Sequence, residues 1–333
     1  MNALLEGIAR NRFLVVGRVG MDAFPHPPGT GVEDVETLHV DMGGSSANTA
    51  AGIIKLGGEA ALVTRVSDDA VGRYCIKKLK HYGVETSYVR PVEGPGAREF
   101  RNSLALYESR VEGHQSVIYR NGAADFQMDR EDVDAVEFAN YGALVTAGTV
   151  FAAEPSRSAT FYAFENAKAH GLPIIFDIDY RPYSWPSAEV AADVLSRAGA
   201  MSDMIVGNDE EFGFMAGDIH KGLDKARELA RTSASIVIYK MGHEGSITIT
   251  ADGETRSGVY RVDALKPTGA GDSFMAGLLS SLADGKSLDE AVTRGSACAA
   301  IVVGKPGCAP AMPNNEQLEA FLSSHPGMTA PTG

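Results

Sequence analysis

The segment from Lys266 to Asp272, which reads Lys-Pro-Thr-Gly-Ala-Gly-Asp, holds the residues best suited to chemistry. Small residues let the backbone turn sharply and expose its N–H groups. The apolar spacing after Ser273 predicts a helix that begins here, and a helix start offers unpaired donors and the positive end of a dipole. Such a turn can hold a phosphate group. Asp272 beside it is placed to accept a proton from an attacking hydroxyl, so the segment predicts phosphoryl transfer to an alcohol.

Strands and helices are predicted to alternate along the chain around this segment. We expect buried strands at residues 13–17, 60–64, 142–148, 172–177, 204–207 and 236–239. We expect helices at residues 46–56, 71–82, 156–170, 188–198 and 222–232. This alternation predicts an α/β fold with a mostly parallel sheet covered by helices on both faces. Ligands in such folds bind outside the carboxyl ends of the strands.

Two segments, residues 35–40 and 98–120, instead alternate apolar with polar residues, which is typical of one-sided antiparallel strands. We predict a small β lid at about residues 31–42 and 98–121, within one domain over residues 12–322. A lid that closes would exclude water, which competes as phosphoryl acceptor. The alternative is an edge extension of the main sheet. Residues 323–333 are small and polar with two prolines, and we expect a flexible tail.

Composition sets limits on the class of protein. The 333 residues are 44% hydrophobic and 22% charged, as in ordinary globular proteins, and the net charge is −13. This charge argues against nucleic acid or an anionic membrane as the main partner. Cys75, Cys298 and Cys308 are scattered and odd in number, which favours a reducing, cytoplasmic location. The sequence has no apolar run of membrane-spanning length and no apolar signal segment before Arg12.

Two motifs in this chain resemble the signatures of the PfkB/ribokinase family of carbohydrate kinases. The segment 266–272 with Ala276-Gly277 resembles the C-terminal signature, and Gly43-Gly44-Ser45-Ser46-Ala47-Asn48-Thr49-Ala50 with Gly57 resembles the N-terminal one. The two occur in the family's order, and the resemblance covers residues 13 to about 321. It implies the ribokinase-like fold, with a mostly parallel sheet and a β lid. It also implies magnesium-bound ATP as the phosphoryl donor.

The resemblance assigns roles around the reacting atoms. Asp272 matches the family's catalytic base, and the backbone N–H groups of Gly269, Ala270, Gly271 and Asp272 match its anion hole. Asp22, Gly43, Gly44 and Asn48 match the residues that bind the acceptor sugar. The alternatives are structural: a glycine-rich helix start at 269–272, a turn at Asp22, and a second helix start at Gly43 and Gly44 with Asn48 facing the core.

Residues on the nucleotide side are assigned in the same way. Asn208 and Glu211 resemble the family's Asn-x-x-Glu motif near magnesium and phosphate, with Glu211 acting on the metal through water. Lys240, Gly242 and Gly245 resemble its nucleotide loop, and residues 297–304 resemble a wall of the adenine pocket. The alternatives are helix capping by Asn208, a hairpin turn, and an apolar core helix.

Lys266 departs from the family pattern, because many relatives carry an aspartate there that contributes to a monovalent-cation site. A lysine repels potassium, and its ammonium group can substitute for the charge of the ion. We therefore count Lys266 with the nucleotide-side residues and predict weak or no activation by potassium. The alternative is a solvent-exposed lysine without a role.

Two arginines suggest an acidic acceptor. Arg120 closes the predicted lid and Arg181 follows a predicted strand, and an arginine fork matches a carboxylate at two points. The alternative is that they pair with acids such as Asp125 or Asp179. The surrounding segments resemble those of kinases that act on keto-deoxy sugar acids. The first candidate acceptor is 5-dehydro-2-deoxygluconate of inositol catabolism, phosphorylated on its primary C6 hydroxyl.

Other acceptors and other classes stay open. The second candidate is 2-keto-3-deoxygluconate, and the third is a neutral sugar of the fructokinase type. Ribose is a poor candidate, because Gly20 stands where ribokinase has asparagine and Ser45 where it has lysine. A non-catalytic sugar or nucleotide sensor on the same fold is a further alternative. A dehydrogenase is disfavoured because residues 13–20 lack the third glycine of a dinucleotide fingerprint. Exposed lid strands favour a homodimer.

Overall fold

The computed structural model describes residues 1–110 and 112–329. Its centre is a nine-stranded sheet in the order β13-β12-β11-β10-β9-β8-β1-β4-β5. The strands are β1 (Arg12–Val16), β4 (Glu59–Val66), β5 (Val89–Pro91), β8 (Ala143–Ala147), β9 (Ile174–Asp177), β10 (Met204–Asn208), β11 (Ile236–Lys240), β12 (Ser246–Thr250) and β13 (Gly253–Ser257). The strands from β5 to β11 are parallel, as predicted, and the last two at the edge are antiparallel.

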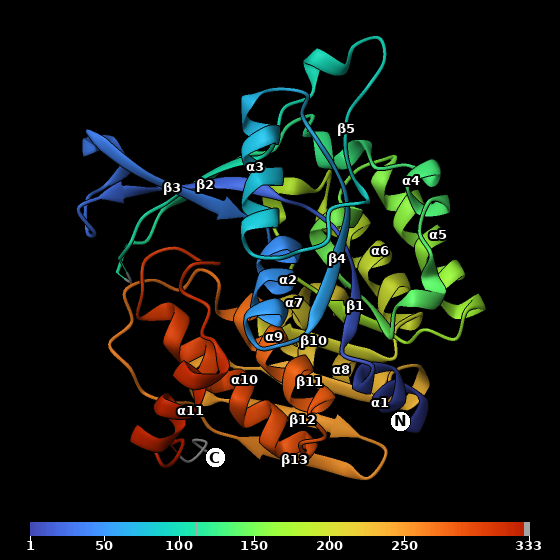
Figure 1. Cartoon of the computed structure of the whole chain (residues 1–333). Helices are drawn as coiled ribbons and strands as arrows, with labels where there is room; N and C mark the ends of the chain where they lie inside the picture. The colour runs from blue at the N-terminus through green and yellow to red at the C-terminus, as the bar shows by residue number, and fades with distance from the viewer. Residues whose placement is uncertain (111, 330–333) are drawn as a thin grey trace.

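Helices cover both faces of this sheet (Figure 1). One face packs against α1 (Asn2–Ala9), α2 (Ser45–Lys55), α3 (Ala70–His81), α9 (Ala270–Ala283), α10 (Leu288–Val303) and α11 (Asn315–Ser324). The other packs against α4 (Arg130–Asp134), α5 (Ser156–Ala169), α6 (Ala188–Ala200), α7 (Asp209–Ala216) and α8 (Gly222–Thr232). Alternate residues of β1 supply the two cores: Phe13 and Val15 belong to the first, Leu14 and Val16 to the second. This is why the buried strands are continuous apolar runs.

A separate four-stranded sheet forms the lid-like element and extends away from the body (Figure 1). Its order is β3 (Thr37–Gly43), β2 (Gly20–His26), β6 (Leu104–Tyr107), β7 (Ser116–Tyr119). It is not an extension of the main sheet, whose outermost strand on that side is β5. The expected segments contribute β3, β6 and β7, but β2 was not predicted as a strand. Asp22 therefore lies within a strand of this sheet and not in a turn.

The inner face of the small sheet contacts the body. Phe24, Ala105 and Tyr107 pack against Cys308, which follows α10. At the carboxyl end, α11 continues to Ser324, and the backbone N–H of Thr329 donates to Val259 at 2.9 Å. The described part of the segment predicted as a loose tail is thus helical at its start and held at Thr329, while residues 330–333 lie outside the described residues. Among the described residues, no helix has the length and apolar character needed to cross a membrane.

Candidate active site

A cavity of about 530 Å³ lies where the parallel strands end, bordered by the small sheet. Asp177, Asn208 and Lys240 are the last residues of β9, β10 and β11, and all three line it. Tyr107 and Ser116 reach it from the small sheet. Because parallel strands that end at one edge converge there, the topology collects polar side chains from distant parts of the chain in one place.

The predicted anion hole forms one wall of this cavity. Gly269 precedes α9 with φ at 85°, and a side chain there would be strained and would lie 3.0 Å from the Cys308 Sγ. Ala270, Gly271 and Asp272 make up the first turn of α9, and all line the cavity together with Gly269. Their backbone N–H groups have no partner from a preceding turn, which is the arrangement that binds phosphate oxygens.

Asp272 contacts the other predicted signature directly. Its Oδ2 accepts a hydrogen bond of 2.9 Å from Asn48 Nδ2, which α2 carries. Burial raises the pKa of Asp272 to about 6, nearby Asp179 raises it as well, and the hydrogen bond from Asn48 lowers it. At neutral pH the carboxylate is mostly ionised, so it is available as a proton acceptor and is a stronger base than an exposed aspartate.

Close backbone approach explains the glycines on the acceptor side. Gly43 pairs with Gly20 across β3 and β2, and a Cβ on Gly43 would overlap the carboxylate of Asp22. Gly44 has φ at 98°, and a Cβ there would lie 2.6 Å from the carbonyl oxygen of Arg18. Gly44, Asp22 and Asn48 line the cavity, whereas Gly43 lies behind Asp22. Burial raises the pKa of Asp22 to about 7.

The nucleotide-side residues also meet at the cavity. Lys240 lies close to the anion hole, since a Cβ on Gly271 would be 3.6 Å from its Nζ. Asn208 and Glu211 form a reciprocal capping box on α7, with hydrogen bonds of 2.7 and 2.8 Å, and both line the cavity. Capping, the structural alternative, is therefore observed and does not remove these side chains from the site.

The loop after β11 and the helix α10 complete this side. Gly242 and Gly245, with φ at 56° and 97°, line the cavity within the connection that turns β11 into β12. The hairpin alternative thus describes the topology of this loop correctly. In the segment 297–304, Ala299 faces the cavity, whereas Ala297 is fully buried in the core.

Comparison with known proteins identifies the family. The model of the pfkB family carbohydrate kinases matches residues 10–315. The chain is 34% identical over 318 residues to the 5-dehydro-2-deoxygluconokinase of Geobacillus kaustophilus, and the match covers 94% of each chain. It is 35% identical to the 5-dehydro-2-deoxygluconokinase of Photobacterium profundum, covering 93% of this chain and 94% of that one. The chain belongs to the pfkB family of carbohydrate kinases.

Solved structures agree on the fold. A putative ribokinase II of E. coli, in complex with ATP and Mg²⁺, superposes with a TM-score of 0.83 at 18% identity, covering 94% of this chain and 99% of that one. Fructokinase of Vibrio cholerae, with fructose, ADP and calcium bound, gives a TM-score of 0.81 at 24% identity, with 94% and 99% covered. The predicted ribokinase-like α/β fold is thereby confirmed for this carbohydrate kinase.

Lys266 lies behind the anion hole of the kinase and does not line the cavity. Its side chain is fully buried, and Nζ donates to the carbonyl oxygens of Thr268 at 2.6 Å and Val302 at 3.3 Å. Burial lowers the pKa of Lys266, while Cys308 and Asp272 raise it. The alternative of a solvent-exposed lysine is therefore wrong. The ammonium group ties the loop before Gly269 to the end of α10.

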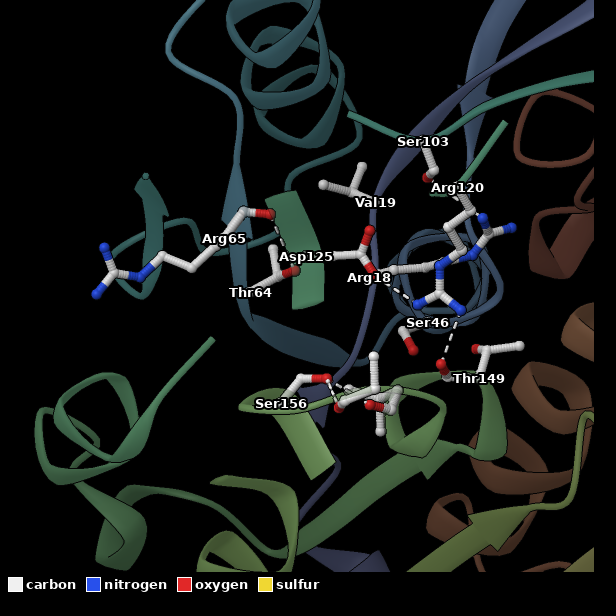
Figure 2. Close-up of polar contacts among 12 residues, drawn as sticks. Arg18, Val19, Ser46, Thr64, Arg65, Ser103, Arg120, Asp125, Thr149 and Ser156 are labelled. Carbon is white, nitrogen blue, oxygen red and sulfur yellow. Dashed lines mark hydrogen bonds and ion pairs between the residues drawn. The ribbon is translucent and has the colours of Figure 1, made fainter. Parts of the chain in front are cut away.

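The two arginines predicted to bind an acid occupy different places. Arg120 is buried and does not line the cavity, because its guanidinium group pairs with Asp125 and donates to the carbonyl oxygen of Thr149 at 2.7 Å (Figure 2). The pairing left open as an alternative is thus the one observed for Arg120. Arg181 lines the cavity, yet its Nη2 lies 2.7 Å from Asp179 Oδ1, the other acid named as an alternative partner.

Arg18 and Asp177 line the cavity although the sequence patterns assigned them no role, and Asp179 was expected only as a possible partner of an arginine. Arg18 follows β1, and Asp177 and Asp179 follow or end β9. Burial raises the pKa of Asp177, although nearby Lys240 opposes this effect. Asp179 has φ at 35°, a strained value for a residue with a side chain, and such strain is common at functional sites. A polar residue directly after a buried parallel strand was the available signal for all three.

Proposed function

We propose that this kinase transfers the γ-phosphate of ATP to the primary hydroxyl of a keto-deoxy sugar acid, with 5-dehydro-2-deoxygluconate as the acceptor. The observation that carries the chemistry is the hydrogen bond between Asn48 and Asp272, which joins the acceptor side to the first turn of α9. The names of the relatives at 34–35% identity over nearly full length support the choice of acceptor.

The proposed reaction follows from the positions of these groups. Asp22, Gly44 and Asn48 hold the acceptor with its primary hydroxyl at Asp272. Asp272 accepts the hydroxyl proton as the oxygen attacks the γ-phosphorus, and the bond to the β-phosphate oxygen breaks, leaving ADP. The N–H groups of residues 269–272 and the ammonium group of Lys240 stabilise the negative charge that develops on the phosphate oxygens.

Magnesium fits the carboxylates of the site in a limited way. The described residues contain no cluster of three or more His, Cys, Asp or Glu side chains suited to hold a metal by themselves. One oxygen of Glu211 caps α7, and the other is 3.9 Å from Arg181, which leaves room for contacts through water. Magnesium binds through few carboxylates and keeps several waters, so Glu211 is proposed to hold it through water. When bound, the ion neutralises charge on the nucleotide phosphates.

A panel of acceptors tests the proposed function. ADP release is measured with 5-dehydro-2-deoxygluconate, 2-keto-3-deoxygluconate, fructose and ribose side by side, at one ATP concentration. We expect the highest kcat/KM with 5-dehydro-2-deoxygluconate. A higher kcat/KM with 2-keto-3-deoxygluconate, fructose or ribose would make that compound the proposed acceptor. If ATP binds but no compound causes ADP release, the protein would be better explained as a sensor.

We further propose that the kinase is a homodimer formed through the small sheet. Leu38, Val40, Val117 and Tyr119 are 39–59% exposed, and the strand register places all four on the face opposite Asp22. A second copy of the same sheet is apolar in the same place and would cover them. We expect sedimentation velocity to give a dimer and Val40→Glu to give a monomer. A monomeric wild type would contradict this.

The three cysteines bear on the compartment. Cys75, Cys298 and Cys308 are all buried and unpaired among the described residues. Burial raises the pKa of each thiol, which keeps it protonated and unreactive. This arrangement supports the proposal that the kinase acts in the cytoplasm.

A further inference from the structure

We propose that Arg18 binds the carboxylate of the acceptor and so determines the preference of the kinase for sugar acids. This inference rests on the proposed function and assigns its acid-binding residue. Arg18 lies between β1 and β2, where the chain passes from the central sheet into the small sheet, and it lines the cavity. Its residue is 7% exposed.

The ionic partners of the three nearby arginines differ. Arg120 is paired with Asp125, and Arg181 is paired with Asp179. Among the described residues, no carboxylate oxygen lies within 4.0 Å of the Arg18 guanidinium group. Its Nη1 donates to Ser103 Oγ at 3.2 Å, and its Nε is buried without a hydrogen-bond partner. A buried cation without a paired anion is costly, so a carboxylate bound in the cavity would balance the charge of this guanidinium group.

The surroundings add to this positive charge. Figure 2 shows the side chains of Arg18 and Arg120 next to each other, with Asp125 paired to Arg120. Asp22 and Asp179 are the cavity carboxylates whose charges act on Arg18; Asp179 is paired with Arg181, and burial raises the pKa of Asp22 to about 7 although Arg18 lowers it. Of the two neighbouring guanidinium groups, only that of Arg120 forms an ion pair, with Asp125. The unbalanced charge lies at the acceptor side of the cavity.

Gly20 explains how Ser103 reaches Arg18. A Cβ on Gly20 would lie 2.6 Å from Ser103 Oγ, and the backbone N–H of Met21 donates to the Ser103 carbonyl at 3.1 Å. The missing side chain at position 20 therefore leaves the space that Ser103 fills while it orients the guanidinium group. A residue with a side chain at position 20 would displace Ser103. Glycine at position 20, where ribokinase has asparagine, is therefore needed for the hydrogen bond that orients Arg18.

Arg18 and the proposed base Asp272 both line the cavity. The hydroxyl to be phosphorylated must lie at Asp272, next to Asn48. Arg18 forms no ion pair with Asp272 within 4.0 Å in the described chain, and its hydrogen-bond partner Ser103 directly precedes β6 of the small sheet. The carboxylate and the primary hydroxyl are the two ends of the sugar acid. Binding one end at Arg18 presents the other to the base.

The test compares each enzyme on two acceptors: 5-dehydro-2-deoxygluconate and its uncharged primary amide. For Arg18→Gln we expect kcat/KM with the acid to fall about 10- to 150-fold, the size of one lost charge-assisted contact, and the value with the amide to change little. Arg18→Lys keeps the charge but not the fork, and we expect an intermediate loss. Ser103→Ala should weaken the acid preference less than Arg18→Gln. ADP affinity, measured alongside, should match the wild type, and thermal melting shows that each variant is folded.

Three outcomes would overturn the inference. An unchanged acid-to-amide ratio in Arg18→Gln would do so while leaving the proposed function intact. A ratio that collapses in Arg181→Gln and not in Arg18→Gln would assign the carboxylate to Arg181 instead. A wild type that turns over neutral sugars but not the acid would remove both the inference and the proposed function. If Arg18→Gln does not fold, Arg18→Lys and Ser103→Ala decide by the same ratio.

Discussion

At the proposed phosphate end of the cavity, the anion hole and the base come from one short run of chain, residues 269–272, at the start of a single helix, and only Lys240 is added from β11. At the acceptor end, they come from several segments: Asp22 from β2, Asn48 from α2 and Arg18 from the connection before β2. In this proposal the phosphate end relies mainly on backbone N–H groups, and the acceptor end relies on side chains. We therefore expect substitutions at the acceptor end to change the choice of acceptor with little effect on phosphate binding.

The largest effect is expected at the phosphate end. Asp272→Asn should lower kcat about 10²- to 10⁴-fold, because the amide cannot accept the proton from the hydroxyl. Affinity for ADP and thermal stability should stay near those of the wild type. Asp284→Asn, at the exposed far end of the same helix, is the matched control and should keep full activity. Turnover near the wild-type rate in Asp272→Asn would show that the assigned base is wrong.

A smaller effect is expected where backbone and carboxylate approach each other at the acceptor end. Gly43→Ala should displace Asp22, because the new methyl group overlaps its carboxylate. We expect kcat/KM for the acceptor to fall about 10- to 100-fold, with ADP affinity unchanged. The control is Gly327→Ala, where the added Cβ meets no atom within 4 Å. A parallel loss of ADP affinity in Gly43→Ala would mean that the two ends are not separable.

The pH dependence tests how the two ends are coupled. Asp272 must be ionised to act, and its pKa is raised to about 6, so kcat/KM should fall as the pH drops through about 6. Asn48→Ala removes a hydrogen bond that lowers this pKa, and the acidic limb should therefore move to higher pH. Asp22, with a pKa of about 7, adds a second step that this variant leaves in place. If the acidic limb lies at the same pH in the wild type and in Asn48→Ala, the hydrogen bond from Asn48 does not control the pKa of Asp272.

The smallest effect is expected from potassium. Because the ammonium group of Lys266 already binds the carbonyl oxygens of Thr268 and Val302, rates in potassium and sodium chloride should be equal. Lys266→Met leaves these carbonyls without that donor and should lower the free energy of unfolding by about 1–3 kcal/mol. A strong rise in the wild-type rate with potassium over sodium would refute the interpretation of Lys266.

The order of the elements was largely readable from the sequence. Six parallel strands and six helices, including the one that begins at Ala270, occur close to the predicted residues, because a strand buried on both faces must be apolar throughout and each crossover needs a helix. The strands β2, β5, β12 and β13 were not predicted. β5 has only three residues, and β2 contains Pro25, which is unusual inside a strand.

The sequence alone indicated the phosphoryl-transfer chemistry, because the proposed anion hole and base are neighbours along the chain at the start of one helix. Only the tertiary structure decided which arginine lines the cavity without an ionic partner. Arg18, Arg120 and Arg181 are chemically identical, and the ionic partner of each is set by packing among β2, the small sheet and the residues after β9. Pairing over such separations is decided by the approach of distant segments, so no local pattern could distinguish the unpaired guanidinium group from the paired ones.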